Sequence, residues 1–333
     1  MENVTVKVSP TLGIRIFGGT SYALLSTIGL ILNVLLIAVF LKNRSRFSRN
    51  AFYTIAWQLV ICDVLTQLME FVVPIPITFA AKQVYGKTPL LYVPCAIDTI
   101  AYNGYLFFSC LMTINRFTVF VMPKTNHALF HSPRLYGTVT CLWLCLLALL
   151  ATHHVFACYK SFSSTGFHYL HACYENYENT PLIGQITRTI FNNCSTYLPI
   201  GMFLCYVVMI VHIKIRTKET EHNLEGKRWS QEVSLLAQSF LICAFIEAQS
   251  ICFFLTQNLK TTGQLSILIN IFGNWVSLLL SSVHPLVLFT FNQTIRSRLK
   301  QLVQRRTVVR GIQHSSLGRR SPTPSITVHP TTL

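Results

Sequence analysis

The chain has 333 residues and a formal net charge of +16, yet only 11% of its residues are charged and 51% are hydrophobic. A soluble domain carries charge on about a quarter of its residues, so this composition cannot cover a water-exposed surface of comparable size. Nucleic-acid binding is excluded as well, because it needs basic side chains gathered on a soluble face, whereas here long apolar segments separate them. The composition therefore indicates a protein embedded in lipid.

Seven long apolar segments follow one another along the chain. A helix that crosses a bilayer needs about 20 apolar residues, and each segment is long enough. In chain order they are Phe17–Leu41, Ala51–Ala81, Leu90–Met122, Leu135–Ala157, Thr189–Val211, Val233–Leu259 and Gln264–Ile295. We therefore predict an all-α membrane protein built as a seven-transmembrane helix bundle.

Shorter regions flank this bundle. We expect an N-terminal stub at residues 1–16, one bundle domain at 17–303 and a tail at 304–333. In residues 292–303, the basic residues Arg296, Arg298 and Lys300 stand among the apolar residues Ile295, Leu299 and Leu302. This mixture is typical of an amphipathic helix that lies on a membrane surface. The tail combines Arg, Ser and Pro, a composition typical of disorder.

Successive connections between the seven segments lie alternately on the two sides of the membrane, and the basic residues are distributed unequally between these sides. Twenty of the 27 Lys and Arg residues lie on the side that holds the tail. Cytoplasmic loops carry such an excess, so we place the N-terminus outside and the helix at 292–303 in the cytoplasm. The sequon Asn3-Val4-Thr5 then lies outside, where it predicts glycosylation of Asn3.

Three cysteines fall on the predicted outer side. Cys95 begins the third segment, and the longest connection carries Cys158 and Cys173. Because an oxidising environment favours disulfides, we expect Cys95 to pair with Cys173, with Cys158 as the alternative partner.

Ionisable residues interrupt the second and third segments. Ionisable groups inside a membrane bundle face its interior and mark functional sites. Asp63 and Glu70 are two helical turns apart, and Asp98 and Arg116 are five turns apart, so each pair lies on one helix face. We expect Arg116 at the cytoplasmic edge and Asp98 near the outer cavity.

Asp63 lies near the middle of its segment, within reach of Asn33, Ser281 and His284 if the first, second and seventh helices are neighbours. This predicts a central polar cluster. Its members either hold the helices together by hydrogen bonds or, in the case of Asp63, take part in switching or ion binding.

Individual polar, aromatic and proline residues mark six of the seven segments. Their order and spacing along the chain resemble those of the rhodopsin-like G-protein-coupled receptors. The positions are Asn33, Asp63, Asn115-Arg116-Phe117 with Pro123, Trp143, Pro199, and His284-Pro285 followed by Asn292 and Arg296. Joint order and spacing across most of the chain make the resemblance specific.

Several positions depart from the pattern of that superfamily. Asn115 replaces the usual acid before Arg116, which predicts that the resting-state ionic restraint on this Arg is missing or weaker. His284 replaces the usual Asn before Pro285, and Cys95 lies four residues nearer to Arg116 than the usual bridging cysteine. These departures are similar to the nematode serpentine chemoreceptors, class X or a related class.

The resemblance implies a multi-pass, non-enzymatic receptor of the plasma membrane that contacts membrane lipids and needs no cofactor. It would bind an extracellular small-molecule or peptide ligand and activate a heterotrimeric G protein. The implied residues are Asn115, Arg116, Phe117 and Pro123 for coupling, Asn33, Asp63, Ser281, His284 and Pro285 for the central cluster, and Glu70, Asp98, Tyr102 and Glu247 for the ligand pocket.

The acidic pocket favours a cationic or hydrogen-bonding ligand. Asp98 has the spacing from Arg116 at which amine receptors of the superfamily hold their counter-ion, but pairing of Asp98 with a neighbouring residue is an equal alternative.

Other classes stay open as alternatives. A neuropeptide or amine receptor of the same superfamily would share the pattern, whereas a transporter is expected to show two related halves, and none is visible. An ion channel of the same topology is a further alternative. A di-iron enzyme is disfavoured, because His127 and His131 map to one side of the membrane and His153 and His154 to the other, about 30 Å apart.

Overall fold

A computed structural model provides the structure of the chain. It describes residues 9–48, 50–86, 88–173, 181–220, 226–259, 261–302 and 304. Asn3 and the predicted tail therefore lie outside the described residues. For Cys173 the description covers the backbone alone.

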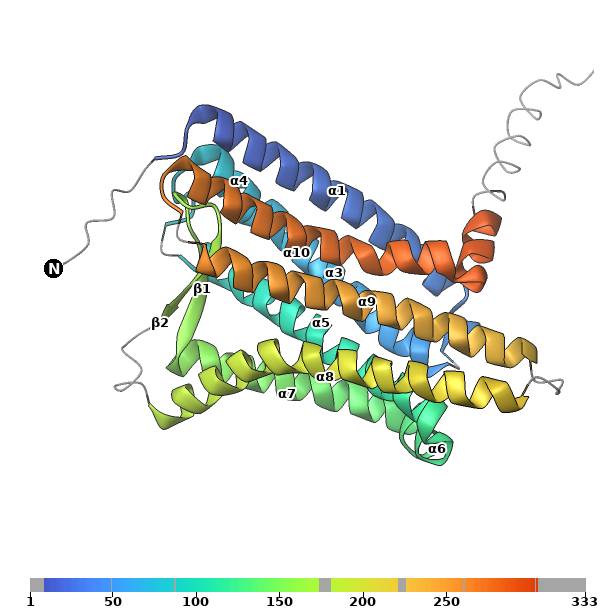
Figure 1. Ribbon diagram of the computed structural model, residues 1–333. Coiled ribbons are helices and arrows are strands. Elements are labelled where there is room, and N and C mark those ends of the chain that lie inside the picture. Colours follow the sequence, from blue (N-terminus) through green and yellow to red (C-terminus); the bar gives the residue numbers. More distant parts are fainter. Residues whose placement is uncertain are drawn as a thin grey trace, which may run out of the picture.

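Seven spans that are long and apolar enough to cross a membrane occur within the described residues. They run side by side as one bundle (Figure 1) and confirm the predicted seven-helix architecture. The spans are α1 (Leu12–Lys42), α3 (Ala51–Val72) with α4 (Pro74–Ala80), α5 (Pro89–Val121), α7 (Ser132–Phe156), α8 (Leu182–Thr220), α9 (Gly226–Asn258) and α10 (Gln264–Phe291).

Short elements distinguish the two ends of the bundle. One end carries α2 (Arg44–Phe47), α6 (Pro123–Phe130) and a further helix at residues 293–302; we call it the Arg116 end. The other end carries an antiparallel hairpin of β1 (Cys158–Phe162) and β2 (Tyr169–Cys173), and we call it the hairpin end.

Two breaks in the helices have local causes. The second span is interrupted at Val73, because Pro74 has no N–H to continue the hydrogen-bonding ladder and instead begins α4. The seventh span ends at Phe291, and Asn292 turns the chain into the helix at 293–302. Ile295 on that helix is fully buried while Arg296 is exposed, so the helix is amphipathic.

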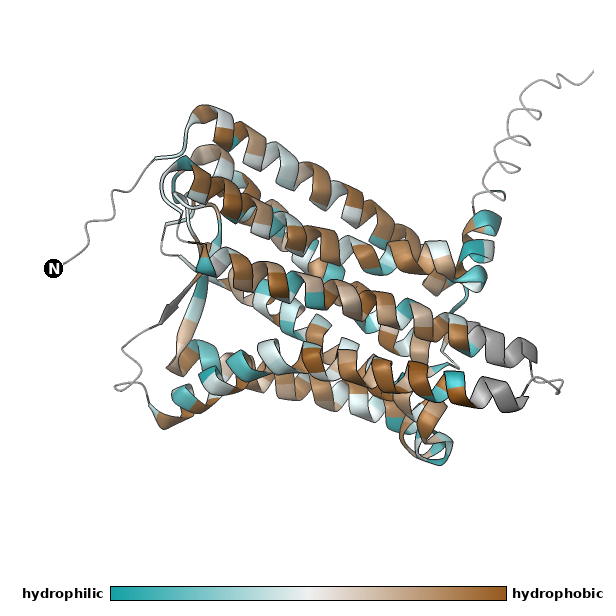
Figure 2. Ribbon diagram, in the orientation of Figure 1, coloured by the Kyte–Doolittle hydropathy of each residue, from teal (hydrophilic) through white to brown (hydrophobic). Residues whose placement is uncertain are grey.

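Hydrophobic residues predominate along the spans (Figure 2), and large apolar side chains are found both buried and exposed. Leu24, Leu204 and Phe254 are each about 60% exposed, which would be costly in water but matches a lipid environment. The buried core extends through the Arg116 half of the bundle, and a second, smaller cluster lies beneath the hairpin.

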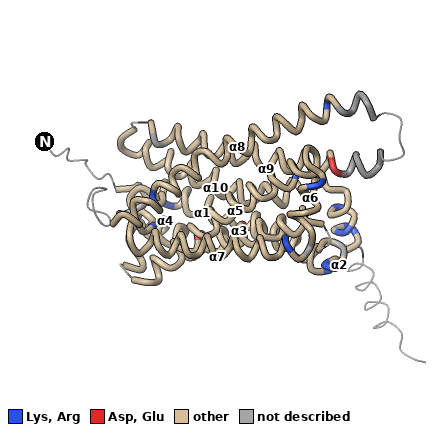
Figure 3. Tube along the Cα trace, turned by 90° about the horizontal axis from the view of Figure 1, so that it is seen from below, with Lys and Arg blue, Asp and Glu red and all other residues tan. Residues whose placement is uncertain are grey.

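Basic side chains gather at the Arg116 end (Figure 3). Described examples there are Lys42, Arg44, Lys124, Arg134, Lys214, Arg296, Arg298 and Lys300. Fewer described basic residues, among them Arg15, Lys82 and Arg188, lie toward the hairpin end.

The predicted disulfide to Cys95 is wrong. Cys95 is a fully buried free thiol in α5, whereas Cys158 is disulfide-bonded. The hairpin explains the difference, because its register sets Cys158 opposite Cys173, and directly opposite residues of an antiparallel pair are close enough for a disulfide. The connection thus folds back on itself, and no disulfide to Cys95 links it to α5.

Candidate functional site

The centre of the bundle holds a buried carboxyl–imidazole pair. Asp63 in α3 and His284 in α10 lie 3.3 Å apart, measured from Oδ2 to Nδ1, and neither side chain is more than 1% exposed. The second ring nitrogen of His284, Nε2, has no hydrogen-bond partner. The structure thus brings together two of the residues expected in the central cluster.

A second group of hydrogen bonds lies next to this pair and joins three helices. Asn33 Nδ2 in α1 donates to the Ser281 carbonyl at 3.0 Å and to Gln67 Oε1 at 3.3 Å. Gln67 Nε2 in α3 donates to the same Ser281 carbonyl. This close approach needs Gly29 in α1, because a Cβ there would lie 2.1 Å from Gln67 Nε2.

Arg116 in α5 is 2% exposed and is held on two sides. Its Nε and Nη2 donate to Asn115 Oδ1 at 3.2 and 2.6 Å, and its Nη1 forms an ion pair with Glu232 Oε2 in α9 at 2.9 Å. The guanidinium also lies over the Phe52 ring, 5.2 Å from the centroid. The expected loss of ionic restraint is therefore wrong, because Glu232 supplies the carboxylate that position 115 lacks.

The remaining members of the expected coupling group follow Arg116 closely in the sequence. Phe117 packs against the main core, and Pro123 is the first residue of α6. Asn115 Nδ2 donates to Asn126 Oδ1 in α6 at 3.3 Å. The same oxygen accepts a hydrogen bond from Thr118, so α6 is fastened to the end of α5.

A cleft of about 270 Å³ opens beside Glu232 at the Arg116 end. Across it, Asn292 Nδ2 donates to Tyr53 Oη and to Gln238 Oε1, both at 3.1 Å, and thereby links α10 to α3 and α9. These contacts hold α9 against its neighbours beside the cleft.

The hairpin end contains a second ion pair. Lys160 Nζ in β1 bonds to Asp98 Oδ2 in α5, and the ammonium lies 3.9 Å from the ring centroid of Tyr169 in β2. Lys160 is 14% exposed and Asp98 is 6% exposed. Asp98 is therefore occupied by the protein's own cation.

Glu70 in α3 belongs to the same cluster. It interacts electrostatically with Asp98 and Lys160 and is 2% exposed. Among the described residues, no hydrogen bond or ion pair joins Tyr102 or Glu247 to it; Glu247 interacts with Cys243 one turn away on α9. The structure thus groups two of the four expected pocket residues.

Three side chains fasten the hairpin to the bundle by donating to its carbonyl groups. Tyr22 in α1 bonds to Phe167 at 3.2 Å, Gln83 bonds to Phe162, and Asn270 in α10 bonds to Gly166 at 2.9 Å. The Phe162 and Phe167 side chains are fully buried. The hairpin therefore closes this end of the bundle as a plug.

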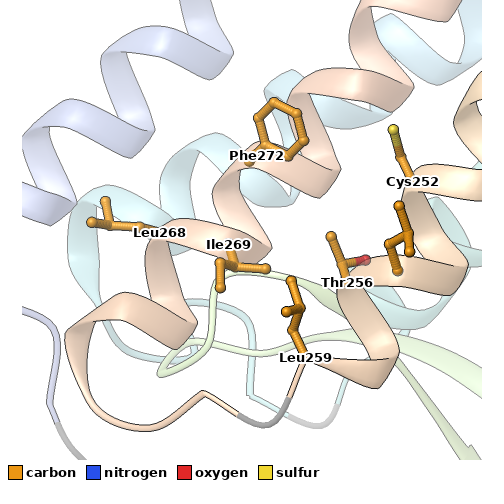
Figure 4. A pocket seen from close by; sticks show the side chains of 7 residues that line it. Cys252, Thr256, Leu259, Leu268, Ile269 and Phe272 are labelled. Atoms are coloured by element: carbon orange, nitrogen blue, oxygen red, sulfur yellow. The ribbon is translucent and has the colours of Figure 1, made fainter.

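A groove between α9 and α10 is an unsuitable ligand site. It is an apolar groove of about 340 Å³ between α9 and α10, and its side chains point outward from both helices (Figure 4). Leu255 and Phe272 in its lining are each about half exposed. We interpret it as a lipid-facing groove of the membrane surface.

Metal ligation has little support in the described part of the chain. There, no three His, Cys, Asp or Glu side chains gather in a way that could hold a metal ion. The rings of His127 and His131 lie 5.6 Å apart at the Arg116 end, while His153 packs on Phe191 near the hairpin end.

Sequence reasoning missed Gln67, Glu232 and Lys160. Gln67 lies one turn from Asp63 on the same helix face, so helical periodicity could have identified it. Glu232 directly precedes the predicted sixth segment, where a charge is typical of a loop. Lys160 carried no signal, because its position depends on how a long connection folds.

Comparisons with known proteins agree with this geometry. The family described as serpentine type 7TM GPCR chemoreceptor Srx matches residues 24–292. The crystal structure of squid rhodopsin superposes with a TM-score of 0.69 at 16% identity, covering 88% of this chain and 86% of that one. No curated protein sequence matches the chain.

Proposed function

The chain belongs to the serpentine-type seven-transmembrane chemoreceptor family Srx, and from this we propose that it binds an external ligand at the hairpin end and activates a heterotrimeric G protein at the Arg116 end. As a member of that family it is a multi-pass, non-enzymatic G-protein-coupled receptor of the chemoreceptor type. The ligand, the coupling and the plasma membrane as its location are our proposal.

The distribution of charge supports this orientation. Cytoplasmic ends of membrane proteins carry the excess of Lys and Arg, and the Arg116 end carries most of the described basic residues. The hairpin end, with disulfide-bonded Cys158, would then face the oxidising outside. The amphipathic helix at 293–302 would lie on the inner membrane surface.

The observation that carries the proposal is the Arg116–Glu232 pair between α5 and α9. Arg116 is almost completely buried, and Glu232 is 26% exposed at the edge of a cleft. If α9 moved outward, the pair would break, and the guanidinium would become available to a partner in an enlarged cleft. Such a two-partner arrangement is a bistable element that a ligand at the other end can bias.

The test is a ligand screen in cells with a G-protein readout. We expect an activating ligand whose response is lost in Arg116→Ala, at equal surface expression. Lys42→Ala, an exposed basic residue at the same end, should retain the response. Ligand-evoked current that persists without any G protein would contradict the proposal and favour a channel.

A further inference from the structure

An ionic cluster with unequal charge lies beneath the hairpin. Asp98 and Glu70 contribute two carboxyl groups, and Lys160 contributes one ammonium. Lys160 is bonded to Asp98 and its ammonium lies over the Tyr169 ring. Asp98 is thus neutralised within the protein, and the second carboxyl group is in excess.

Glu70 is the group without a bonded partner. Its Oε2 is buried and makes no hydrogen bond with any described residue, and the side chain is 2% exposed. A buried polar atom without a partner destabilises the fold, and a charged one does so more strongly. No described donor bonds to Glu70 Oε2, and a bound cationic donor would satisfy this atom.

Two neutral polar groups at the same end of the bundle also lack hydrogen-bond partners among the described residues. Tyr169 Oη makes no hydrogen bond, and neither does Asn274 Nδ2 in α10, although the Asn274 amide faces the Tyr22 hydroxyl. Tyr22 and Tyr169 both interact electrostatically with Glu70. Burial, followed by the charges of Asp98 and Glu70, raises the pKa of Tyr169 well above its ordinary value, so this phenol stays neutral.

We propose that Glu70, and not Asp98, is the counter-ion for a small primary amine that binds beneath the hairpin. An ammonium group has three donors, which would satisfy Glu70 Oε2 and Tyr169 Oη. Asn274 Nδ2 would donate to a hydroxyl or carbonyl oxygen next to the amine. Lys160 would keep its place on Asp98. The inference rests on the proposed receptor function and names its ligand class.

The charges in the cluster favour an amine over an organic acid. Lys160 already has both Asp98 and the Tyr169 ring as partners. An anion would find no unpaired positive charge in the cluster, because Lys160 is already bonded to Asp98, and repulsion by Asp98 is strong where water is excluded. Like charges placed together in this way select against the wrong class of ligand.

Thermal unfolding of the purified full-length chain in detergent tests this without a G protein. The probes are primary amines with a hydroxyl or carbonyl oxygen on the neighbouring carbon, with the matching carboxylic acids and neutral alcohols as comparisons. We expect amines alone to raise the Tm by several degrees at saturation, because a ligand that binds only the folded state stabilises it.

Substitutions then locate the counter-ion. Glu70→Gln should weaken amine binding about tenfold or more, whereas Glu247→Gln, a partly buried acid elsewhere in the bundle, should not. The double substitution Asp98→Asn with Lys160→Met removes both partners of the Lys160–Asp98 ion pair and should leave amine binding intact. Glu70→Asp keeps the charge and should bind weakly, which provides a second variant if Glu70→Gln does not fold.

Three results would overturn the inference. They are stabilisation by acids instead of amines, amine binding that survives Glu70→Gln but not the double substitution, and no stabilisation by any amine of the panel. A different result would contradict the receptor function while supporting the amine site: amines would raise the Tm without activating a G protein. Activation of a G protein by a ligand that is not an amine would overturn the ligand class alone.

Discussion

Arg116 in α5 and Glu232 in α9 form an ion pair in which Nη1 and Oε2 are 2.9 Å apart, with the guanidinium 2% exposed and the carboxylate 26% exposed. Asn115 stands where rhodopsin-like receptors usually have an acid next to this arginine, and it accepts two hydrogen bonds from the guanidinium. Restraint of the arginine is therefore divided between an amide on its own helix and a charge on a different one. Only the second contact depends on where α9 stands.

We expect Glu232→Gln to raise ligand-independent activity. The partly exposed pair contributes about 1 kcal/mol, and its loss would shift the ratio of active to resting receptor about fivefold. The measurement is nucleotide exchange on a co-expressed G protein without ligand. Glu247→Gln, also in α9, is the control and should leave basal exchange unchanged. Unchanged basal exchange in Glu232→Gln at equal expression would show that the pair does not restrain the receptor.

The buried pair of Asp63 and His284 should contribute to stability as a unit. His284→Ala would leave the Asp63 carboxyl buried without its partner, at a cost of about 1–3 kcal/mol in the free energy of unfolding. His284→Asn keeps a hydrogen-bonding side chain and should cost less. Thermal unfolding in detergent measures both.

A double-mutant cycle gives the control for this pair. Asp63→Asn combined with His284→Ala should be less destabilised than the sum of the single variants, because the interaction between the two side chains can be lost only once. Strict additivity would mean that the two side chains do not interact.

Gly29 is expected to tolerate no side chain. A Cβ at this position would lie 2.1 Å from Gln67 Nε2 and 2.5 Å from Ser282 Oγ. In Gly29→Ala the Gln67 side chain would have to move and lose its bond to Ser281, and we expect a loss of about 1–3 kcal/mol in unfolding free energy.

Gly201 in α8 offers a matched control, because nothing lies within 4 Å of a Cβ built there. Gly201→Ala should be neutral or stabilising by up to about 1 kcal/mol, since alanine favours helix. Equal Tm values for Gly29→Ala and Gly201→Ala would contradict the tight approach of α1 and α3.

Features that depend on local composition could be predicted from the sequence. The seven spans follow from apolar length, and the meeting of Asp63 and His284 follows from their depth and from the order of the helices. Even Gln67 lies on the predicted polar face. Such features need no knowledge of loop conformation.

Features that depend on a long connection could not be predicted. The hairpin register sets Cys158 opposite Cys173 and carries Lys160 into the bundle. Neither the periodicity of apolar residues nor the pattern of charges specifies where such a loop lies against the bundle. The predicted partner of Cys95 was wrong for this reason, and the neighbour that pairs with Asp98 could not be named for the same reason.

The hydrogen bonds that fasten this hairpin should control its opening. Tyr22→Phe would leave the buried Phe167 carbonyl without its donor, at a cost of about 1 kcal/mol. We expect backbone amides at 158–168 to exchange with deuterium about fivefold faster, as local opening becomes more frequent. Tyr197→Phe is the control, because that tyrosine is 65% exposed on α8. Asn270→Ala removes the bond to Gly166 and should accelerate exchange of the same amides. Unchanged exchange in both variants would mean that these two hydrogen bonds do not control the opening of the hairpin.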